Sequence, residues 1–397
     1  MKVNKDIINC LSDFYDMIFL TIIYIDMKRF NLYTITEDKR LRKVGKSSLE
    51  SATREVKVKK ITTINDVARE AGVAASTVSR VLADSPRISS ETKERINKII
   101  QELDYHPNIL ARSLASKTTN IVAILIPELT EKAFRHPFFP EIIRGITAMA
   151  HKYCYNILLT SVSDVKEEKK YIKELINGGI VSGLILLASR TKDPCIAELR
   201  KSKFPFVVVG RPQIEDDVNW VDNNNMSIAY DLTMHLIEQG HKKIAFVGLT
   251  PEFVVTMDRY EGYKRALQES GIEIEPDLVL NGKYIDDAGF ELAKQLPAPR
   301  LAYTAVIACD DLLAFGIMKY LNEKGLKIPD DVAIAGFNNF PLCEYVTPTL
   351  TSVKVNEFDL GSKAFQILYS NIEGNVKSFN RSIIPAELII RKSTQKQ

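Results

Sequence analysis

The stretch that decides the fold of this chain runs from Thr63 to Leu82 and reads TINDVAREAGVAASTVSRVL. Apolar residues recur at i, i+3, i+4 and i+7 from Ile64, which predicts a short amphipathic helix. Gly72 then permits a turn, and a second helix is predicted with an inward apolar face made of Val78, Val81 and Leu82. Its outward face carries small hydroxyl groups and a guanidinium group, on Ser76, Thr77, Ser79 and Arg80.

A third helix is predicted to follow Ser89, a residue type that caps helix N-termini well. One stripe of this helix carries Ile96, Ile99, Ile100 and Leu103, so three apolar stripes can close one small core. The polar outer face of the second helix suits the major groove of DNA. The segment therefore favours a helix-turn-helix DNA-binding domain over a helical corner of an enzyme or scaffold.

Three motifs in this order, TINDVAREAGV, STVSRVL and YHPNILARSLASKTTN, resemble the lac repressor family of bacterial transcription regulators. The resemblance runs from about Thr63 to the C-terminus. It implies an α-helical helix-turn-helix DNA-binding domain followed by an α/β two-lobed periplasmic-binding-protein-like domain with parallel sheets. We expect the DNA-binding domain over residues 61–107, a hinge helix and linker over 108–119, and an effector-binding and dimerisation domain over 120–397.

The resemblance also assigns DNA-contacting residues. It places Ala75, Ser76 and Arg80 at base-reading positions and Thr77 and Ser79 toward the DNA backbone. Thr63 is also expected to belong to the DNA-binding site. Arg80 is the strongest candidate, because a guanidinium group can bind guanine in the major groove. Ala74 departs from the serine that is common there, which removes an expected N-cap. The segment with Asn108, Ala111 and Leu114 matches a hinge helix that forms on DNA and inserts its leucine into the minor groove.

Net charge is unevenly distributed along the chain. Residues 57–119 carry 11 Lys or Arg against 7 Asp or Glu, whereas residues 120–397 carry 32 against 35. The positive excess therefore accompanies the helix-turn-helix, as expected if that part alone meets phosphates. Because the excess is modest, we expect specific affinity to require a homodimer on a pseudo-palindromic operator.

Catalysis and metal binding have no visible carrier in the sequence. The five cysteines are scattered without CxxC spacing, which fits a reducing cytoplasm, and no Ser/His/Asp, Walker or HExxH motif occurs. We therefore expect no enzyme activity and no cofactor.

Residues 1–60 stand outside the family pattern. The apolar run from Met17 to Ile25 is only nine residues long, too short to span a bilayer, and it lacks a signal-peptidase site. The charged stretch from Lys39 to Lys60 lacks sustained periodicity. We expect this extension to be either an upstream start-site artefact or a dispensable arm.

From Asn120 onward, apolar strands alternate with amphipathic helices, as in IVAILIP, NILLTS, GLILLA, FVVVG, KKIAFVG, AVIACD and VAIAGF. Continuous apolar strands are buried on both faces, so parallel sheets covered by helices are predicted. The length favours two α/β lobes. The resemblance implies inter-lobe crossovers near Trp220, Asn338 and Val355.

Parallel sheets bind ligands beyond the carboxyl ends of their strands, which directs attention to Ser189, Arg211, Asp310 and Asn338. The resemblance adds Phe138 in HPFF, where the family commonly has NPFF, together with Arg259 and Tyr284. Aromatic rings and bidentate polar groups complement a sugar, so Phe138, Trp220 and Tyr284 are expected to stack and Arg259 and Asp310 to hydrogen-bond. For Trp220, core packing and ligand stacking are equally expected. For Phe139, core packing is favoured over ligand contact. Asp311, Asn223 and Asn224 are expected to be solvated or to cap helices.

These features predict an allosteric repressor of sugar-utilisation genes. Segments such as HPFFPEIIRGI and NWVDNNN resemble the maltose-operon repressors of Gram-positive bacteria, so maltose or a maltodextrin is the expected effector. A catabolite-control-type regulator with a protein or phosphosugar co-repressor remains an alternative. A purine effector is a less favoured alternative. A sugar-binding protein without DNA function and a sugar-active enzyme are the other two.

Overall fold

The computed structural model describes residues 62–82, 84–105, 119–127, 134–162, 165–213, 217–282, 288–375 and 378–395. Four of the predicted site residues, Asn108, Ala111, Leu114 and Tyr284, lie outside these ranges, as do residues 1–60. The chain divides into two compact units at the joint between His106 and Pro107. Within the described ranges no helix combines the length and the apolar character needed to cross a membrane.

The N-terminal unit is a three-helix domain made of α2 (Ile64–Glu70), α3 (Ala75–Leu82) and α4 (Ser90–Glu102). Its core joins all three helices through Val67, Ala68, Ala71, Val78, Val81, Ile96 and Tyr105. Gly72 adopts a φ of 65°, so the turn between α2 and α3 uses the left-handed conformation that glycine tolerates. Ser89 caps α4 by accepting a hydrogen bond from the amide of Thr92, which confirms the predicted start of this helix.

The C-terminal unit contains two six-stranded sheets, one in each of two lobes. The strands of the first lobe are β1 (Ile121–Pro127), β2 (Asn156–Val162), β3 (Gly183–Leu186), β4 (Phe206–Val209), β5 (Trp220–Asp222) and β11 (Arg381–Ile383), in the order β11-β5-β4-β3-β1-β2. The second lobe contains β6 (Ile244–Gly248), β7 (Val279–Asn281), β8 (Ala305–Ala308), β9 (Ala333–Asn338), β10 (Thr351–Lys354) and β12 (Glu387–Ile389), in the order β12-β10-β9-β8-β6-β7. The predicted parallel pairing is confirmed everywhere except at β12, which runs antiparallel to β10.

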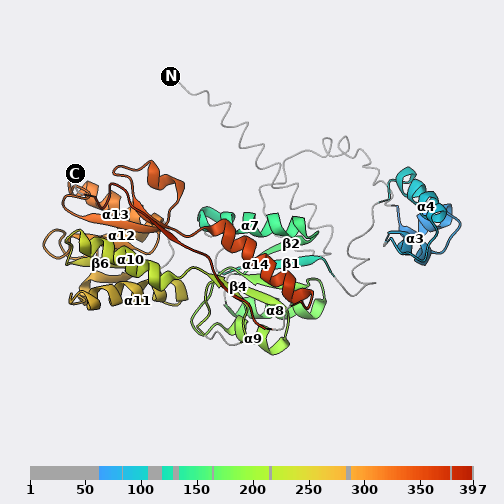
Figure 1. Cartoon of the computed structure of the whole chain (residues 1–397), viewed down its shortest axis with the longest axis horizontal. Helices are drawn as coiled ribbons and strands as arrows, with labels where there is room; N and C mark the ends of the chain where they lie inside the picture. The colour runs from blue at the N-terminus through green and yellow to red at the C-terminus, as the bar shows by residue number, and fades with distance from the viewer. Residues whose placement is uncertain are drawn as a thin grey trace, which may run out of the picture. The chain divides into compact units, whose positions relative to one another are not determined.

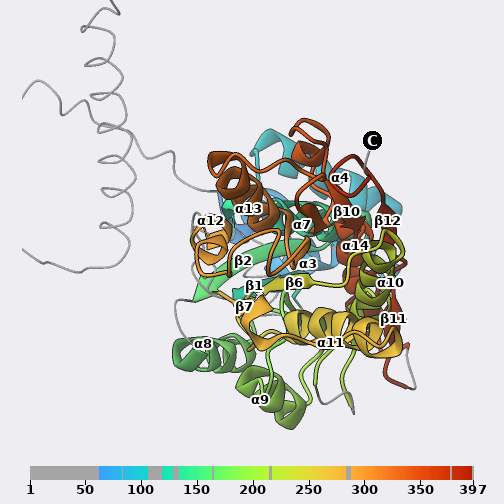
Figure 2. The same ribbon diagram turned by 90° about the vertical axis from the view of Figure 1, so that its left-hand side faces the viewer.

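Helices cover both faces of each sheet. In the first lobe, α7 (Phe138–Lys152) and α14 (Glu357–Ile372) cover one face and α8 (Val165–Gly178) and α9 (Pro194–Ser202) cover the other. In the second lobe, α12 (Ala288–Ala293) and α13 (Asp311–Glu323) lie opposite α10 (Asn225–Glu238) and α11 (Val254–Glu269), with β6 between the pairs (Figure 2). Short 3-10 turns, η2 (Pro276–Leu278) and η3 (Pro341–Glu344), complete the second lobe.

The first lobe incorporates α14 from near the end of the chain, where it lies beside α7 (Figure 1). Gly145 on α7 and Gly361 on α14 let the two helix backbones approach closely. A Cβ on Gly145 would collide with the carbonyl of Phe358, and one on Gly361 would collide with the carbonyl of Ile142. This contact fixes the late segment of the chain on the early lobe.

The chain passes between the lobes three times, after β5, after β10 and between β11 and β12. The predicted crossovers near Trp220 and Val355 match the first two. The prediction near Asn338 is wrong, because β9 continues into β10, its neighbour in the same sheet, and the third crossover runs through Ile384. Asn223 links the crossovers, since its Nδ2 donates to the carbonyl oxygens of Val355 (3.0 Å) and Ile384 (2.8 Å).

Candidate functional site

The outer surface of α3 is the first candidate site. Ser76, Ser79 and Arg80 are exposed on it, while Thr77 and Ala75 are half-buried and Ala75 packs partly against the three-helix core. Thr63 begins α2 as its N-cap and exchanges hydrogen bonds with Asp66 in a capping box. The helix therefore presents two hydroxyl groups and one guanidinium group from a rigid support, with no acidic residue in its first turn.

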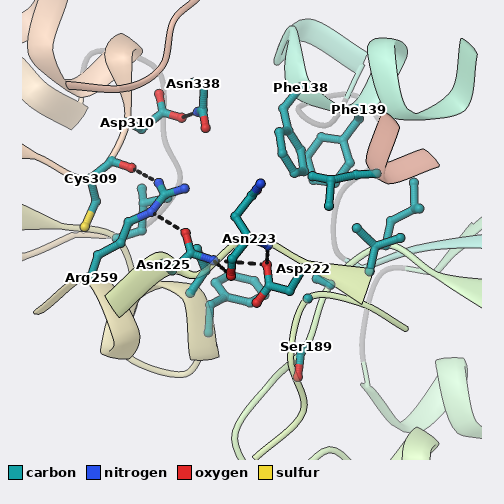
Figure 3. Close-up of a pocket in the computed structure, with 18 of the residues that line it drawn as sticks. Phe138, Phe139, Ser189, Asp222, Asn223, Asn225, Arg259, Cys309, Asp310 and Asn338 are labelled. Atoms are coloured by element: carbon teal, nitrogen blue, oxygen red, sulfur yellow. Dashed lines mark hydrogen bonds between the residues drawn. The ribbon is translucent and has the colours of Figure 1, made fainter. Parts of the chain in front are cut away.

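The second candidate site is a cavity of about 160 Å³ between the two lobes of the C-terminal unit. It lies at the carboxyl ends of the strands, as the sheet argument predicted. Figure 3 shows the two phenylalanines on one side of it and a chain of polar groups on the other. Its apolar and aromatic lining comes from Phe138, Phe139, Leu187, Ala188, Val209, Leu249, Phe253, Val255 and Leu360. The polar lining comes from His136, Ser189, Asp222, Asn223, Asn225, Arg259, Asp310 and Asn338.

Asp310 connects the two lobes across this cavity. It caps α13, where its Oδ1 accepts a hydrogen bond from the amide of Leu312 (2.8 Å). Its Oδ2 accepts from Nδ2 of Asn338 (2.6 Å) and lies 2.8 Å from Nε2 of His136, which belongs to the first lobe. The His136 ring packs edge-on against Phe340 of the second lobe. The His136 side chain thus lies against two residues of the opposite lobe.

Arg259 projects from α11 into the cavity wall and is almost fully buried. Its Nε donates to Oδ1 of Asn225 (3.0 Å), its Nη1 donates to the carbonyl of Cys309, and its guanidinium carbon lies 4.1 Å from the centre of the Phe337 ring. Burial lowers the pKa of this guanidinium group from its ordinary value. These contacts hold the guanidinium group in one position.

Asp222 ends β5 at the first crossover. Its carboxylate accepts hydrogen bonds from the amides of Arg211 and Asn223 (both 2.8 Å) and from Nδ2 of Asn225 (3.0 Å). Burial raises the pKa of this carboxyl group to about 6, against the lowering effect of the amide donors. Ser189 lies nearby on the lining, and its buried Oγ has no hydrogen-bond partner among the described residues. The cavity therefore offers carboxylates, a fixed guanidinium group, a hydroxyl group and aromatic rings to a small polar ligand.

Direct contacts between the lobes border the cavity. The amide of Val254 donates to the carbonyl of Ser189 (3.1 Å), and the amide of Thr191 donates to the carbonyl of Glu252 (2.8 Å). Arg211 forms an ion pair with Asp258 on α11, with Nη2 2.6 Å from Oδ1 and Nε 3.3 Å from Oδ2. The lobes are therefore held together by backbone and side-chain bonds on the same side as Ser189.

Five of the eight predicted effector residues line the cavity, namely Phe138, Ser189, Arg259, Asp310 and Asn338. Arg211 lies beside it with its side chain turned to Asp258. Trp220 is not among the lining residues, because its ring is buried in the core that α8 and α9 cover, so packing is the alternative that the structure favours.

Several residues in or near the cavity were missed or misjudged from the sequence. Asn223 was expected to be solvated or to cap a helix, yet it is buried and joins the crossovers, whereas Asn224 caps α10 as expected. Asp311 is also fully buried, where it accepts hydrogen bonds from the amide of Phe340 and the hydroxyl of Ser352. One sequence signal could have identified His136, namely its departure from the NPFF pattern. No sequence signal pointed to Phe253.

Comparison with known proteins agrees with both units. Residues 63–108 match the model for bacterial regulatory proteins of the lacI family, and residues 233–394 match a periplasmic binding protein-like domain. The HTH-type transcriptional regulator MalR of Streptococcus pneumoniae is 32% identical over 338 residues, which is 84% of this chain and 99% of that protein. Catabolite control protein A of Priestia megaterium is 33% identical over 336 residues, with the same shares covered.

A solved structure of the transcriptional regulator CelR in complex with cellobiose has a TM-score of 0.66 and 29% identity, and covers 84% of this chain and 99% of that chain. The helix-turn-helix, the two-lobed unit and full-length relatives above 30% identity therefore lead to one conclusion. The chain belongs to the lacI family of bacterial regulatory proteins and is a DNA-binding transcriptional regulator, not an enzyme.

Proposed function

We propose that this protein is a repressor whose affinity for operator DNA is set by a small carbohydrate bound between its lobes. The carrying observation is the convergence of Asp222, Arg259 and Asp310 with Phe138 on one cavity. Carboxylates and a fixed guanidinium group suit paired sugar hydroxyls, and an aromatic ring suits the C–H face of a sugar. Maltose or a maltodextrin is the proposed effector, supported by the 32% identity to MalR.

DNA binding is proposed to use a homodimer that presents α3 from each subunit to one half of a pseudo-palindromic operator. Ser76 and Arg80 read bases at the exposed face of α3, with Ala75 beside them and with Thr77 and Ser79 toward the backbone. We propose that residues 108–119 provide a hinge helix and a linker, and that the helix, which includes Asn108, Ala111 and Leu114, folds only on DNA. A ligand that changes the lobe arrangement then changes operator affinity, by roughly 5-fold to 150-fold for ordinary coupling free energies. Such a regulator acts in the cytoplasm, where its operator lies.

Calorimetry on the full chain tests the effector. The panel is maltose, maltotriose, glucose, sucrose and hypoxanthine, followed by an operator shift assay with each compound that binds. The proposal expects at least one sugar to bind and to change operator affinity. Binding of hypoxanthine alone, or unchanged operator affinity with every bound ligand, would contradict it.

A catabolite-control-type regulator is the second candidate, because Catabolite control protein A is equally similar over the same length. In that case a partner protein or a phosphosugar, not a free sugar, would raise operator affinity. The same shift assay separates the two candidates when a phosphosugar is added to the panel.

A further inference from the structure

His136 belongs to the first lobe, but its side chain is held by the second lobe as well. The side chain is 4% exposed, and its Nε2 lies 2.8 Å from Oδ2 of Asp310, whose side chain is 5% exposed. The ring meets Phe138 and Phe139 of its own lobe edge-on, and it meets Phe340 of the second lobe with 5.2 Å between the ring centres. Aromatic groups of both lobes therefore pack the ring, and one of its nitrogens points at a buried carboxyl group.

The contact with His136 fills one oxygen of the Asp310 carboxylate. A carboxylate oxygen accepts about two hydrogen bonds, one for each lone pair. Oδ2 accepts from Nδ2 of Asn338 (2.6 Å) in addition to the His136 contact, while Oδ1 accepts from the amide of Leu312. A sugar hydroxyl that binds Oδ2 must therefore displace one of these two side chains. Asn338 shares the lobe of Asp310, so His136 is the donor that leaves when the lobes separate.

We propose that His136 is a latch, a contact that holds the two lobes together, and that the effector takes its place on Asp310. While the latch is closed, the imidazole group occupies an acceptor that a sugar hydroxyl needs. His136 therefore sets both the population of the closed arrangement and the apparent affinity for the effector. It is a positioning residue, because it acts through Asp310. The competition rests on the proposed carbohydrate effector, whereas the latch does not.

Backbone hydrogen bonds near the cavity can report on the latch without any ligand. The amide of Thr191 donates to the carbonyl of Glu252 in the other lobe. The amide of Leu187, four residues earlier, donates to the carbonyl of Leu125 in the same lobe. Separation of the lobes breaks the first bond and leaves the second intact. Hydrogen exchange at these two amides therefore distinguishes lobe opening from unfolding of the first lobe.

The test compares the full-length wild type with His136→Phe, which keeps an aromatic ring but lacks the donor. In hydrogen exchange resolved at single amides, without added ligand, Thr191 should exchange at least about tenfold faster in the variant and Leu187 at an unchanged rate, because the closed arrangement has lost a hydrogen bond to a charged group. In calorimetry with maltose and with glucose, the sugar that binds should bind the variant at least about fivefold more tightly. A role confined to packing would instead weaken sugar binding or leave it unchanged.

His136→Gln is the matched control, since the amide nitrogen of glutamine can stand where Nε2 stands and donate to Asp310. It should return the Thr191 exchange rate and the sugar affinity most of the way to the wild-type values. If His136→Phe fails to fold in thermal unfolding, His136→Asn replaces it, because its shorter amide stands at the place of Nδ1 and does not reach Asp310.

The outcomes separate the latch from the proposed function. An unchanged Thr191 exchange rate in the variant without the donor overturns the latch. Faster exchange together with weaker or unchanged sugar binding overturns the competition at Asp310 and leaves a carbohydrate effector standing. Failure of both sugars to bind removes them as effectors, and the competition with them, while the exchange rates still decide the latch.

Discussion

Replacement of Arg80 by alanine tests the DNA surface directly. Arg80 is exposed on α3, and the described residues show no side-chain hydrogen bond or ion pair to it, so the substitution should leave the three-helix core intact. A bidentate contact between arginine and guanine contributes about 1–3 kcal/mol of discrimination. The proposed homodimer would place two copies of α3 on one operator, so the loss of binding free energy should reach roughly 2–6 kcal/mol, about 30-fold to 20,000-fold in affinity.

The assay is fluorescence anisotropy at fixed salt on a duplex selected from a random pool, with a scrambled duplex alongside. Arg80→Ala should lower the ratio of specific to non-specific affinity, because base reading is lost. Arg69→Ala is the matched control, since Arg69 is an exposed arginine on α2 whose Nη2 lies 2.8 Å from Oδ1 of Asp66. The Arg69→Ala variant removes the same charge from the same domain. It should weaken binding to the specific and the scrambled duplex by the same factor, or leave both affinities unchanged. An unchanged specificity ratio in Arg80→Ala, in protein that is folded and dimeric, would refute base reading by this residue.

Three further predictions concern the C-terminal unit. Gly145→Val should lower the stability of this unit by about 1–3 kcal/mol, because the added side chain clashes with the α14 backbone. The control Ala148→Val, on the exposed side of α7, should change the melting temperature of the unit little. Asp311→Ala should lower its melting temperature because it leaves the amide of Phe340 and the hydroxyl of Ser352 without their acceptor, and Asp311→Asn should recover part of the loss. Burial raises the pKa of the Asp311 carboxyl group from 3.8 to about 7, so the folded state keeps a proton that the unfolded chain releases; this stabilisation is complete below pH 4 and is lost by about pH 7. Denaturant unfolding should therefore show that the free energy of unfolding falls between pH 5 and pH 8 by about 2–3 kcal/mol more in the wild type than in Asp311→Asn. An equal fall in both proteins would contradict the raised pKa of Asp311.

Local patterns predicted the elements and part of the site. The apolar periodicity of residues 63–103 gave all three helices of the N-terminal unit, since their stripes depend only on nearby sequence. Strand ends were equally informative, because every parallel strand delivers its carboxyl end to the same edge. Ser189, Asp310 and Asn338 were found on the cavity in this way.

Contacts between the lobes could not be read from local patterns. His136 lies 174 residues from Asp310 in the chain, and their 2.8 Å contact depends on how the two lobes meet. The misplaced crossover has a related cause. The chain returns to its own sheet after Asn338 but passes to the other lobe after Asp222. The local sequence pattern is the same in both cases, an apolar strand with a polar residue at its end, so it does not distinguish them.

Several residues that line the cavity also join the lobes, which would give the proposed ligand binding a direct mechanical consequence. Asn223 contributes to the cavity wall and donates to the backbone of the other two crossovers, at Val355 and Ile384. Its neighbour Asp222 accepts the amide of Arg211 through its carboxylate and the amide of Ile384 through its carbonyl. A ligand that hydrogen-bonds to either side chain therefore acts on the segments about which the lobes would turn. Because both lobes also share Asp310 and His136, a ligand that competes for Asp310 must change the free energy of the closed arrangement relative to any open one. Differential affinity for two lobe arrangements is the condition for allosteric control, and in the proposed mechanism it would arise from side chains that serve the cavity and the lobe junction at once.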